Sequence, residues 1–325
     1  AYSDDSKDVS SNITIIDPFA ALPLEAAGLG ALSGLQFFPA FTNYPNANES
    51  GRFDSDDVTH RLSLAYAISD SSSIYVTHSS GFKATSVNMT VDARDVRAAD
   101  PEDATNYEIG LKTTFDNGYI NLAYFDQNIE GFQSNAFSGT GFNLVNAGKE
   151  SHKGVELDSM LALSENLMLR VSAMQLDAVY DSFEKGTCDT TGLAEPEYQC
   201  PAGQPYVDLS GLNPAGIHDL SANANIVYSF NLGGALDGFA RLEYVYEEDT
   251  NLADLIPVSI AERGFKNVNA SLGFNADNWS IMFWGRNITD HETLYSAFPT
   301  TAAPGSFSGY PSAPSTYGVT FKMNL

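Results

Sequence analysis

Basic side chains are scarce in this sequence of 325 residues, where 16 Lys and Arg stand against 41 Asp and Glu and give a formal net charge of -25. This imbalance argues against nucleic acid as a partner, because contacts to phosphates need Lys and Arg. Many of the acids fall between segments of alternating polarity, where hydration of the carboxylates costs little. We interpret them as a solubilising surface rather than a cation site, and we expect no cofactor.

Cysteine occurs only twice, at Cys188 and Cys200, in a segment rich in Gly, Pro and Thr. The two residues lack the Cys and His partners that a zinc site needs. A disulfide is the favoured interpretation, and closing so short a loop would stabilise it by roughly 3 kcal/mol on the chain-entropy model. A lasting disulfide also indicates an oxidising compartment outside the cytoplasm.

Long apolar runs are missing as well, which excludes a membrane-spanning helix because such a helix needs about 18 or more consecutive apolar residues. A strand of a membrane barrel escapes this test, since only every second side chain meets lipid. The first residues show neither a basic n-region nor an apolar h-region. An export signal would therefore have been removed or would lie upstream of residue 1.

The carboxyl-terminal residues 315–325 alternate strictly in polarity. Small or polar residues separate Tyr317, Val319, Phe321, Met323 and Leu325. The final strand of a transmembrane barrel needs this pattern, because one face must meet lipid along its whole length.

Ten further segments alternate in a similar way, so the chain from residue 59 onward is predicted to form eleven strands. Residues 1–58 lack the pattern and are expected to be mostly an extracellular loop that follows the tail of an earlier strand. The predicted strands are 59–68, 74–83, 105–115, 119–133, 145–163, 167–180, 220–230, 239–248, 264–274, 279–290 and 315–325.

The connections between these strands alternate in length, at about 5, 21, 3, 12, 3, 35, 8, 15, 4 and 24 residues. Bacterial outer-membrane barrels show this alternation, because their periplasmic turns are short and their extracellular loops are long. The predicted fold is therefore an all-β, antiparallel transmembrane β-barrel. Eleven strands would leave two open edges in lipid, so we expect about half of a 22-stranded barrel, the size class with a plugged lumen.

The polar faces of the strands would line the interior of such a barrel. Charged and amide side chains on these faces are the candidate lumen-lining residues: Asn106, Glu108, Lys112, Glu156, Asp158, Arg170, Arg241 and Glu243.

Several short stretches resemble the TonB-dependent outer-membrane receptors over nearly the whole chain. The stretches are Ser79-Ser-Gly-Phe-Lys83, Pro101-Glu, Asn106-Tyr-Glu-Ile-Gly-Leu-Lys112, Asn146-Ala-Gly-Lys149, Lys153-Gly-Val-Glu-Leu157, Gly285-Arg-Asn-Ile-Thr-Asp290 and Tyr317-Gly-Val-Thr-Phe321. Each stretch alone is weak evidence for the family, and the resemblance rests on their order and spacing together. The family usually ends in an aromatic residue, whereas this chain ends in Leu325.

The resemblance implies energised uptake of a scarce ligand of the iron-siderophore, cobalamin or oligosaccharide class, across the outer membrane of a Gram-negative cell. The implied partners are outer-membrane lipid, the rest of the barrel with its plug domain, a TonB-type energy-transducing protein that contacts the missing amino-terminal region, and a small-molecule ligand. The plug domain is absent from residues 1–325. In this scheme the matched motif residues set the strand register and are not ligand contacts.

Loop aromatic residues are the weaker candidates for ligand contact, because they could stack on a sugar or an aromatic siderophore. Packing of the same rings over the barrel mouth is the favoured alternative. The residues are Phe132, Phe137, Phe142, Phe298, Phe307 and Tyr310.

Enzymatic activity is not expected. A barrel lipase would need a Ser-His pair facing lipid and oriented by a third group, whereas adjacent strand residues such as His78 and Ser79 point to opposite faces. Two other functions remain open: a soluble, secreted all-β protein that binds or hydrolyses carbohydrate, and a passive porin. Partition of the protein into detergent would distinguish a receptor from the soluble, secreted protein. A plug domain encoded upstream would distinguish a receptor from a passive porin.

Overall fold

The computed structural model describes residues 1–10, 23, 26–28, 50–88, 98–137, 142–189, 192–204, 206–253, 255–300, 303 and 305–324. The side chains of residues 50, 136–137 and 142–143 lie outside this description. Within these limits the chain is built from strands, and none of the described helices is long and apolar enough to cross a membrane.

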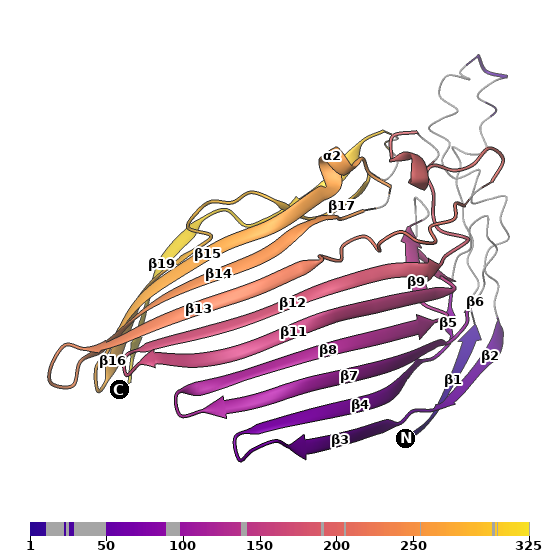
Figure 1. Cartoon of the computed structure of the whole chain (residues 1–325). Helices are drawn as coiled ribbons and strands as arrows, with labels where there is room; N and C mark the ends of the chain where they lie inside the picture. Colours follow the sequence, from indigo (N-terminus) through magenta and orange to yellow (C-terminus); the bar gives the residue numbers. More distant parts are fainter. Residues whose placement is uncertain are drawn as a thin grey trace.

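One antiparallel sheet of eleven strands forms most of the molecule, and it curves strongly from β3 round to β16 and β19 (Figure 1). Strands adjacent in this sheet are also consecutive among the eleven, in the order β19-β16-β15-β14-β13-β12-β11-β8-β7-β4-β3. The strands are β3 (Arg61–Ala67), β4 (Ser72–Lys83), β7 (Glu102–Phe115), β8 (Gly118–Glu130), β11 (Lys149–Ser164), β12 (Leu167–Ser182), β13 (Leu220–Asn231), β14 (Asp237–Asn251), β15 (Glu262–Asn275), β16 (Trp279–Arg286) and β19 (Thr316–Met323).

The eleven-strand prediction is confirmed, and the sheet is open. β3 and β19 end the strand order and do not pair with each other. Each therefore presents one edge of unpaired backbone groups, which a membrane-spanning sheet cannot leave exposed to lipid.

Short turns join the strands at one end of the sheet. One of the two tightest joins β7 to β8 through Asp116 and Asn117, and Gly118 follows with φ +156°. A Cβ at Gly118 would lie 1.9 Å from the carbonyl oxygen of Met160 on β11, so the close approach of these strands requires glycine.

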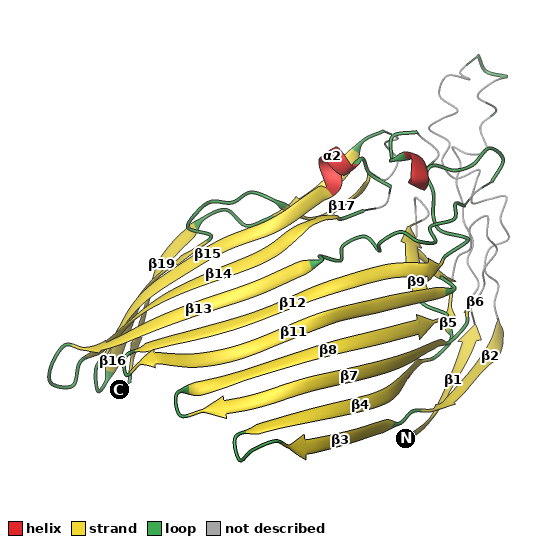
Figure 2. Cartoon of the chain, in the orientation of Figure 1, coloured by secondary structure: helices red, strands yellow, loops and turns green. Residues whose placement is uncertain are grey.

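Longer connections leave the opposite end of the sheet and carry their own small elements (Figure 2). Three two-stranded pairs belong to these connections: β5 (Ser86–Val87) with β6 (Ala98–Ala99), β9 (Gln133–Phe137) with β10 (Phe142–Asn146), and β17 (Leu294–Pro299) with β18 (Phe307–Pro311). The helical elements are η2 (Pro196–Tyr198) and the single turn α2 (Val258–Ala261).

Three predicted strand ends were wrong. Residues 119–133 and 145–163 were each predicted as one continuous strand, whereas in the structure a break separates β8 from β9 and another separates β10 from β11. The backbone leaves the sheet at Gly131, whose φ is +67°. The strand predicted to reach Asp290 ends at Arg286, because Asn287 and Asp290 both adopt positive φ. Alternation in polarity persists across all of these breaks and therefore hides them.

Residues 1–58 include a hairpin that the sequence did not indicate. β1 (Tyr2–Ser10) pairs with β2 (Ser50–Val58), while residues 11–22, 24–25 and 29–49 of the predicted loop lie outside the described part. Polar residues occupy both faces of this hairpin, so it lacks an apolar periodicity. Lys7 Nζ donates to the Thr85 carbonyl oxygen at 2.5 Å and Ser55 bonds Thr85 Oγ1 at 2.9 Å, which ties the hairpin to the end of β4.

Candidate functional site: the polar face of the sheet and the loop layer

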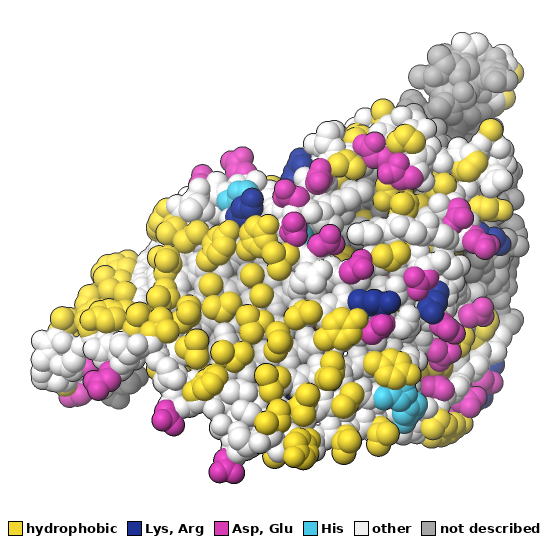
Figure 3. Space-filling view, in the orientation of Figure 1, with side chains coloured by type: hydrophobic (Ala, Val, Ile, Leu, Met, Phe, Trp, Pro, Cys, Tyr) yellow, Lys and Arg dark blue, Asp and Glu magenta, His cyan; other side chains and the backbone are white. Residues whose placement is uncertain are grey.

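One face of the sheet is apolar across all eleven strands, and we call it the apolar face. Cross-strand pairs place apolar side chains side by side, as in Ile74 with Leu111 and Leu111 with Leu122. Many of these side chains are exposed, including Leu64 at 73% and Tyr317 at 67%. Figure 3 shows hydrophobic side chains spread over the strands, with acids gathered toward the end that carries the longer connections. So large an exposed apolar surface marks contact with lipid or with another protein.

The opposite face, here called the polar face, holds all eight candidate lumen-lining residues. Lys112 pairs with Asn121, and Asn121 pairs in turn with Asp158, which places these three side chains in one row. The same registers align Arg170 with Asn225 and Asn225 with Glu243. The remaining candidates on this face are Asn106, Glu108, Glu156 and Arg241.

A hollow of about 470 Å³ lies on the polar face near the short turns, over β11 to β14. Its lining includes Tyr119, Asp158, Arg170, Asn225, Arg241 and Glu243.

Most charged side chains in this hollow interact with neighbouring side chains. When the Asn225 amide is oriented with its oxygen toward Arg241, that oxygen accepts from Nη2 and Nε of Arg241 at 2.6 and 2.7 Å. Glu243 accepts from Asn269 at 3.1 Å and lies 3.4 Å from Arg241. The Tyr119 hydroxyl donates to Asp158.

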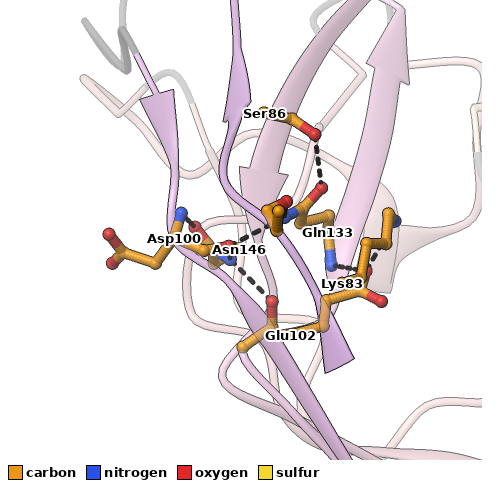
Figure 4. Close-up of polar contacts among 8 residues, drawn as sticks. Lys83, Ser86, Asp100, Glu102, Gln133 and Asn146 are labelled. Atoms are coloured by element: carbon orange, nitrogen blue, oxygen red, sulfur yellow. Dashed lines mark hydrogen bonds and ion pairs between the residues drawn. The ribbon is translucent and has the colours of Figure 1, made fainter. Parts of the chain in front are cut away.

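A network of hydrogen bonds joins two of the long connections where they leave the sheet (Figure 4). Asn146 Oδ1 accepts from the Asp100 N–H at 2.8 Å, while its Nδ2 donates to the carbonyl oxygens of Asp100 at 3.0 Å and Gly131 at 2.6 Å. Glu102 accepts from Lys83 Nζ at 2.8 Å and from the Gln133 N–H at 2.6 Å. We call this set the loop-base network.

The loop-base network gives a structural role to residues quoted above for the family resemblance. Lys83, Glu102 and Asn146 belong to three separate motifs, and the fold brings them together. The sequence did not indicate Gln133 and Asp100, because a single Gln or Asp in a polar loop carries no pattern.

A buried carboxylate on the polar face was also missed. Glu150 is 1% exposed, and one of its oxygens lies 2.6 Å from His152 Nε2. Its second oxygen has no partner among the described residues. The signal in the sequence is a Glu and a His two residues apart on one strand, which is too common to single out.

The longer connections at one end of the sheet together form what we call the loop layer. The buried apolar residues of the described part lie mainly in this layer rather than in the sheet. Outer cluster 1 consists of Val145, Ala147, Tyr180, Phe183, Ala194, Tyr198 and Leu209. Outer cluster 2 consists of Ile256, Ala261 and Ala297. Glu195 accepts from the Val258 N–H at 3.3 Å and joins the connections that carry the two clusters.

A disulfide joins Cys188 to Cys200 beside outer cluster 1. The loop that it closes carries Ala194 and Tyr198, both of which are buried in that cluster. The Asp189 N–H donates to the Tyr198 carbonyl oxygen at 2.7 Å, and the Cys200 N–H donates to the Asp189 carbonyl oxygen at 2.9 Å. The covalent bond and the buried side chains therefore fix the same segment.

We expect replacement of both cysteines, Cys188→Ser with Cys200→Ser, to destabilise this segment by roughly 3 kcal/mol through the entropy of the opened loop. Hydrogen exchange of the backbone amides at Tyr198 and at position 200 should quicken, while exchange in β11 and β12 should stay as in the wild type. Wild-type protein treated with a reductant is the matched control and should reproduce the change. Unaltered protection in both samples would show that the buried side chains alone hold the segment.

The candidate loop aromatics divide into three groups. Phe132 packs against outer cluster 1 and Phe307 against outer cluster 2, which favours the packing alternative for these two. Phe298 and Tyr310 face each other with ring centroids 5.9 Å apart, and Tyr310 is 64% exposed. The side chains of Phe137 and Phe142 lie outside the described part.

A serine on β4 and a histidine next to β3 lie within hydrogen-bond reach, since Ser80 Oγ and His60 Nδ1 are 3.0 Å apart. The same Oγ already accepts the backbone N–H of His60 at 3.1 Å. His60 contacts the ring of His78, at 4.9 Å between centroids, and no carboxylate or amide among the described residues orients it. The pair lacks the third group that a catalytic triad requires.

No set of three or more His, Cys, Asp or Glu side chains in the described part is arranged to hold a metal ion. Exposed acids of the loop layer are instead satisfied locally. The hydroxyl and the backbone N–H of Ser210 lower the pKa of the Asp208 carboxyl below its ordinary value. On the β1–β2 hairpin, Arg52 and then Ser6 lower the pKa of the Asp54 carboxyl in the same way.

Comparison with known proteins identifies the architecture. A family model described as TonB dependent receptor-like, beta-barrel matches residues 28–288. Similar solved structures include the ferric yersiniabactin uptake receptor FyuA from Yersinia pestis, with 16% identity, a TM-score of 0.67 and coverage of 85% of this chain and 39% of that receptor. The siderophore receptor PiuA from Acinetobacter baumannii has 17% identity, a TM-score of 0.60 and coverage of 86% and 38%.

The copper transporter OprC also matches, with 14% identity, a TM-score of 0.56 and coverage of 89% of this chain and 42% of that one. At these identities the likeness shows the fold, and the chain spans about two fifths of the length of the three proteins. The matching family consists of transport proteins rather than enzymes, and its members sit in the outer membrane. With its eleven-stranded sheet, its polar and apolar faces and the match over residues 28–288, this chain belongs to the TonB-dependent receptor-like β-barrel family.

Proposed function

We propose that this chain is the carboxyl-terminal half of the barrel of an outer-membrane receptor that takes up a scarce ligand with energy from a TonB-type protein. The observation that carries the proposal is the apolar face, which continues across all eleven strands while the polar face collects the charges. A barrel wall between lipid and a water-filled lumen requires this division. The open edges at β3 and β19 would pair with the remaining barrel strands.

In this proposal the end with the longer connections is extracellular, because outer-membrane barrels have long loops on that side. The disulfide and the two outer clusters then brace the layer that meets the ligand first. The polar face borders the lumen, where a plug domain supplied by the rest of the receptor would lie. Lipid covers the apolar face, and the small-molecule ligand enters between the loops and the plug.

An iron-siderophore complex is the ligand class that we favour over a cobalamin or an oligosaccharide. Relatives in fold include receptors whose names state ferric siderophores, among them those for ferric yersiniabactin and ferric preacinetobactin. The exposed ring of Tyr310, beside Phe298, could stack on an aromatic chelator. Phe298 and Tyr310 therefore remain the loop aromatics proposed for ligand contact.

Uptake by cells that carry the complete receptor tests the proposal. Cells with and without the receptor gene should be compared for accumulation of radioiron presented as catecholate, hydroxamate or phenolate chelates, with labelled cobalamin and oligosaccharides in parallel. We expect receptor-dependent accumulation of one chelate, abolished by a protonophore. Accumulation that persists with the protonophore would favour a passive porin. Recovery of the protein from a detergent-free supernatant would favour the soluble, secreted alternative.

A further inference from the structure

A second hollow, of about 490 Å³, lies on the apolar face where β14 and β15 approach the longer connections. Its lining includes Tyr244, Lys266, Val268, His291 and Glu292. Lys266 belongs to the apolar face, since its cross-strand partner is Tyr246 and that row continues through Ala222 and Ala173. In Figure 3, basic, histidine and acidic side chains meet at the border of the hydrophobic side chains. We call this site the lipid-side hollow.

The lipid-side hollow exists because β16 is short. β15 and β16 pair no further than Ala270 with Gly285, while β15 continues beyond this pair toward the longer connections. The chain turns away at Asn287, which has a φ of +48° and is 3% exposed. Its side chain accepts the His291 N–H at 2.9 Å and donates to the carbonyl oxygens of His291 at 3.1 Å and Ala313 at 3.0 Å. One wall of the hollow is therefore fixed in advance, which lowers the entropic cost of binding.

The lipid-side hollow lies at the border of the apolar stretch. Lys266 is the first charged side chain on this face of β15, counted from the short turn. The residues of the same face between the turn and Lys266 are Val268, Ala270, Leu272 and Phe274. A basic side chain at the end of such a stretch lies at the level of the lipid headgroups. The remaining barrel strands would pair at the edges of β3 and β19, so they would leave this hollow open to lipid.

Two opposite charges of the hollow are uncommitted. Lys266 Nζ lies 5.8 Å from the ring centre of Tyr246, and neither Lys266 nor Glu292 forms a hydrogen bond or an ion pair with any residue that the structure describes. The Asp290 carboxylate, by contrast, accepts the Ser315 N–H at 2.8 Å. A purely anionic ligand would be repelled by Glu292, and a purely cationic one by Lys266. The separated charges therefore favour a zwitterion.

From these features we infer that the lipid-side hollow binds the headgroup of a zwitterionic membrane lipid, with its phosphate at Lys266, its ammonium at Glu292 and its acyl chains along the apolar face. A phosphoethanolamine headgroup fits best, because its ammonium carries N–H donors for a carboxylate. Thr289 and His291 line the same hollow and offer hydroxyl and ring N–H donors to the phosphate. This inference rests on the proposed function, since it requires the apolar face to meet lipid.

Lipid competition on the complete receptor tests the inference. Receptor freed of lipid in detergent is mixed with equal amounts of phosphatidylethanolamine and phosphatidylglycerol, and native mass spectrometry counts each lipid retained. We expect the wild type to prefer phosphatidylethanolamine. Lys266→Gln should lower its retention about tenfold, the effect expected for loss of one charged hydrogen bond. Glu292→Gln should shift the preference toward phosphatidylglycerol, because the anion that disfavours it is gone. A merely structural role of Glu292 would not reverse the choice of lipid.

Lys153→Gln is the matched control, since Lys153 also lies on the apolar face but its Nζ is 3.6 Å from the Asp126 carboxylate. It should keep the wild-type preference. Heat-modifiable gel mobility shows whether each variant folds, and Glu292→Gln, in an exposed connection, carries the test if Lys266→Gln does not fold. A wild-type preference for phosphatidylglycerol would overturn the inference, as would unchanged retention in the folded variants. Equal competition by soluble phosphoethanolamine would also overturn it, because the acyl chains would then contribute nothing. Failure of the wild-type receptor to insert into membranes would count against the proposed function itself.

Discussion

Leu122→Arg should destabilise the membrane-inserted barrel by about 2–4 kcal/mol, the cost of a basic side chain at the lipid-facing midplane of a membrane barrel. Leu122 lies on the apolar face of β8, 45% exposed, between Leu111 on β7 and Leu157 on β11. Its row is near the middle of the apolar stretch, which ends at Asp126 on the same strand. Snorkelling to an interface is therefore hardest from this position.

The neighbouring residue supplies the control for this experiment. Asn121 points to the polar face beside Asp158, so Asn121→Arg places the same side chain in a polar setting, with a carboxylate within reach. We expect its stability to stay within about 0.5 kcal/mol of the wild type, as for most surface substitutions. Urea titration of the complete receptor in lipid vesicles, followed by heat-modifiable mobility, measures both. Equal losses in the two variants would mean that the apolar face does not meet hydrocarbon.

Alternation in polarity carried most of the information about the fold. It located all eleven strands of the sheet and placed Lys112, Glu156 and Arg241 together on the face opposite the apolar one, because a strand in a barrel wall separates two solvents along its whole length. The alternation pattern failed in segments whose two faces do not differ in polarity. Both faces of the β1–β2 hairpin are polar, and the breaks at Gly131 and Asn287 come from backbone conformation, which polarity does not record.

The candidate site was predictable at the level of faces and not at the level of contacts. Glu102 and Asn146 were recognisable as motif residues, yet their partners Gln133 and Asp100 come from other connections and meet them only in three dimensions. Outer cluster 1 combines Val145 of β10 and Ala147 after it with Tyr180 of β12 and residues of the β12–β13 connection, for the same reason. Loop packing depends on contacts between segments that are distant in the sequence, and no periodicity in the sequence predicts these contacts.

Asn146→Ala should open the base of the longer connections, at a cost of about 3 kcal/mol for three hydrogen bonds worth about 1 kcal/mol each. The side chain accepts from the Asp100 N–H and donates to the carbonyl oxygens of Asp100 and Gly131. Its loss leaves those backbone groups without their partner at the junction of two connections. β9 and β10 should therefore exchange amide hydrogens about a hundredfold faster, the rate change that corresponds to about 3 kcal/mol.

Asn128→Ala is the matched control, because among the described residues the side-chain amide of Asn128 makes a single hydrogen bond, to Asp126 on its own strand at 3.1 Å. Its exchange in β9 and β10 should differ from the wild type by less than about fivefold, in keeping with the loss of one hydrogen bond. β8 and β11 should stay protected in both variants, since their backbone ladder is intact. Rapid exchange throughout β8 and β11 in Asn146→Ala would place this residue in the folding of the whole sheet. Wild-type exchange in β9 and β10 would show that Glu102 and Gln133 hold the loop base without Asn146, because they are joined by a hydrogen bond of 2.6 Å.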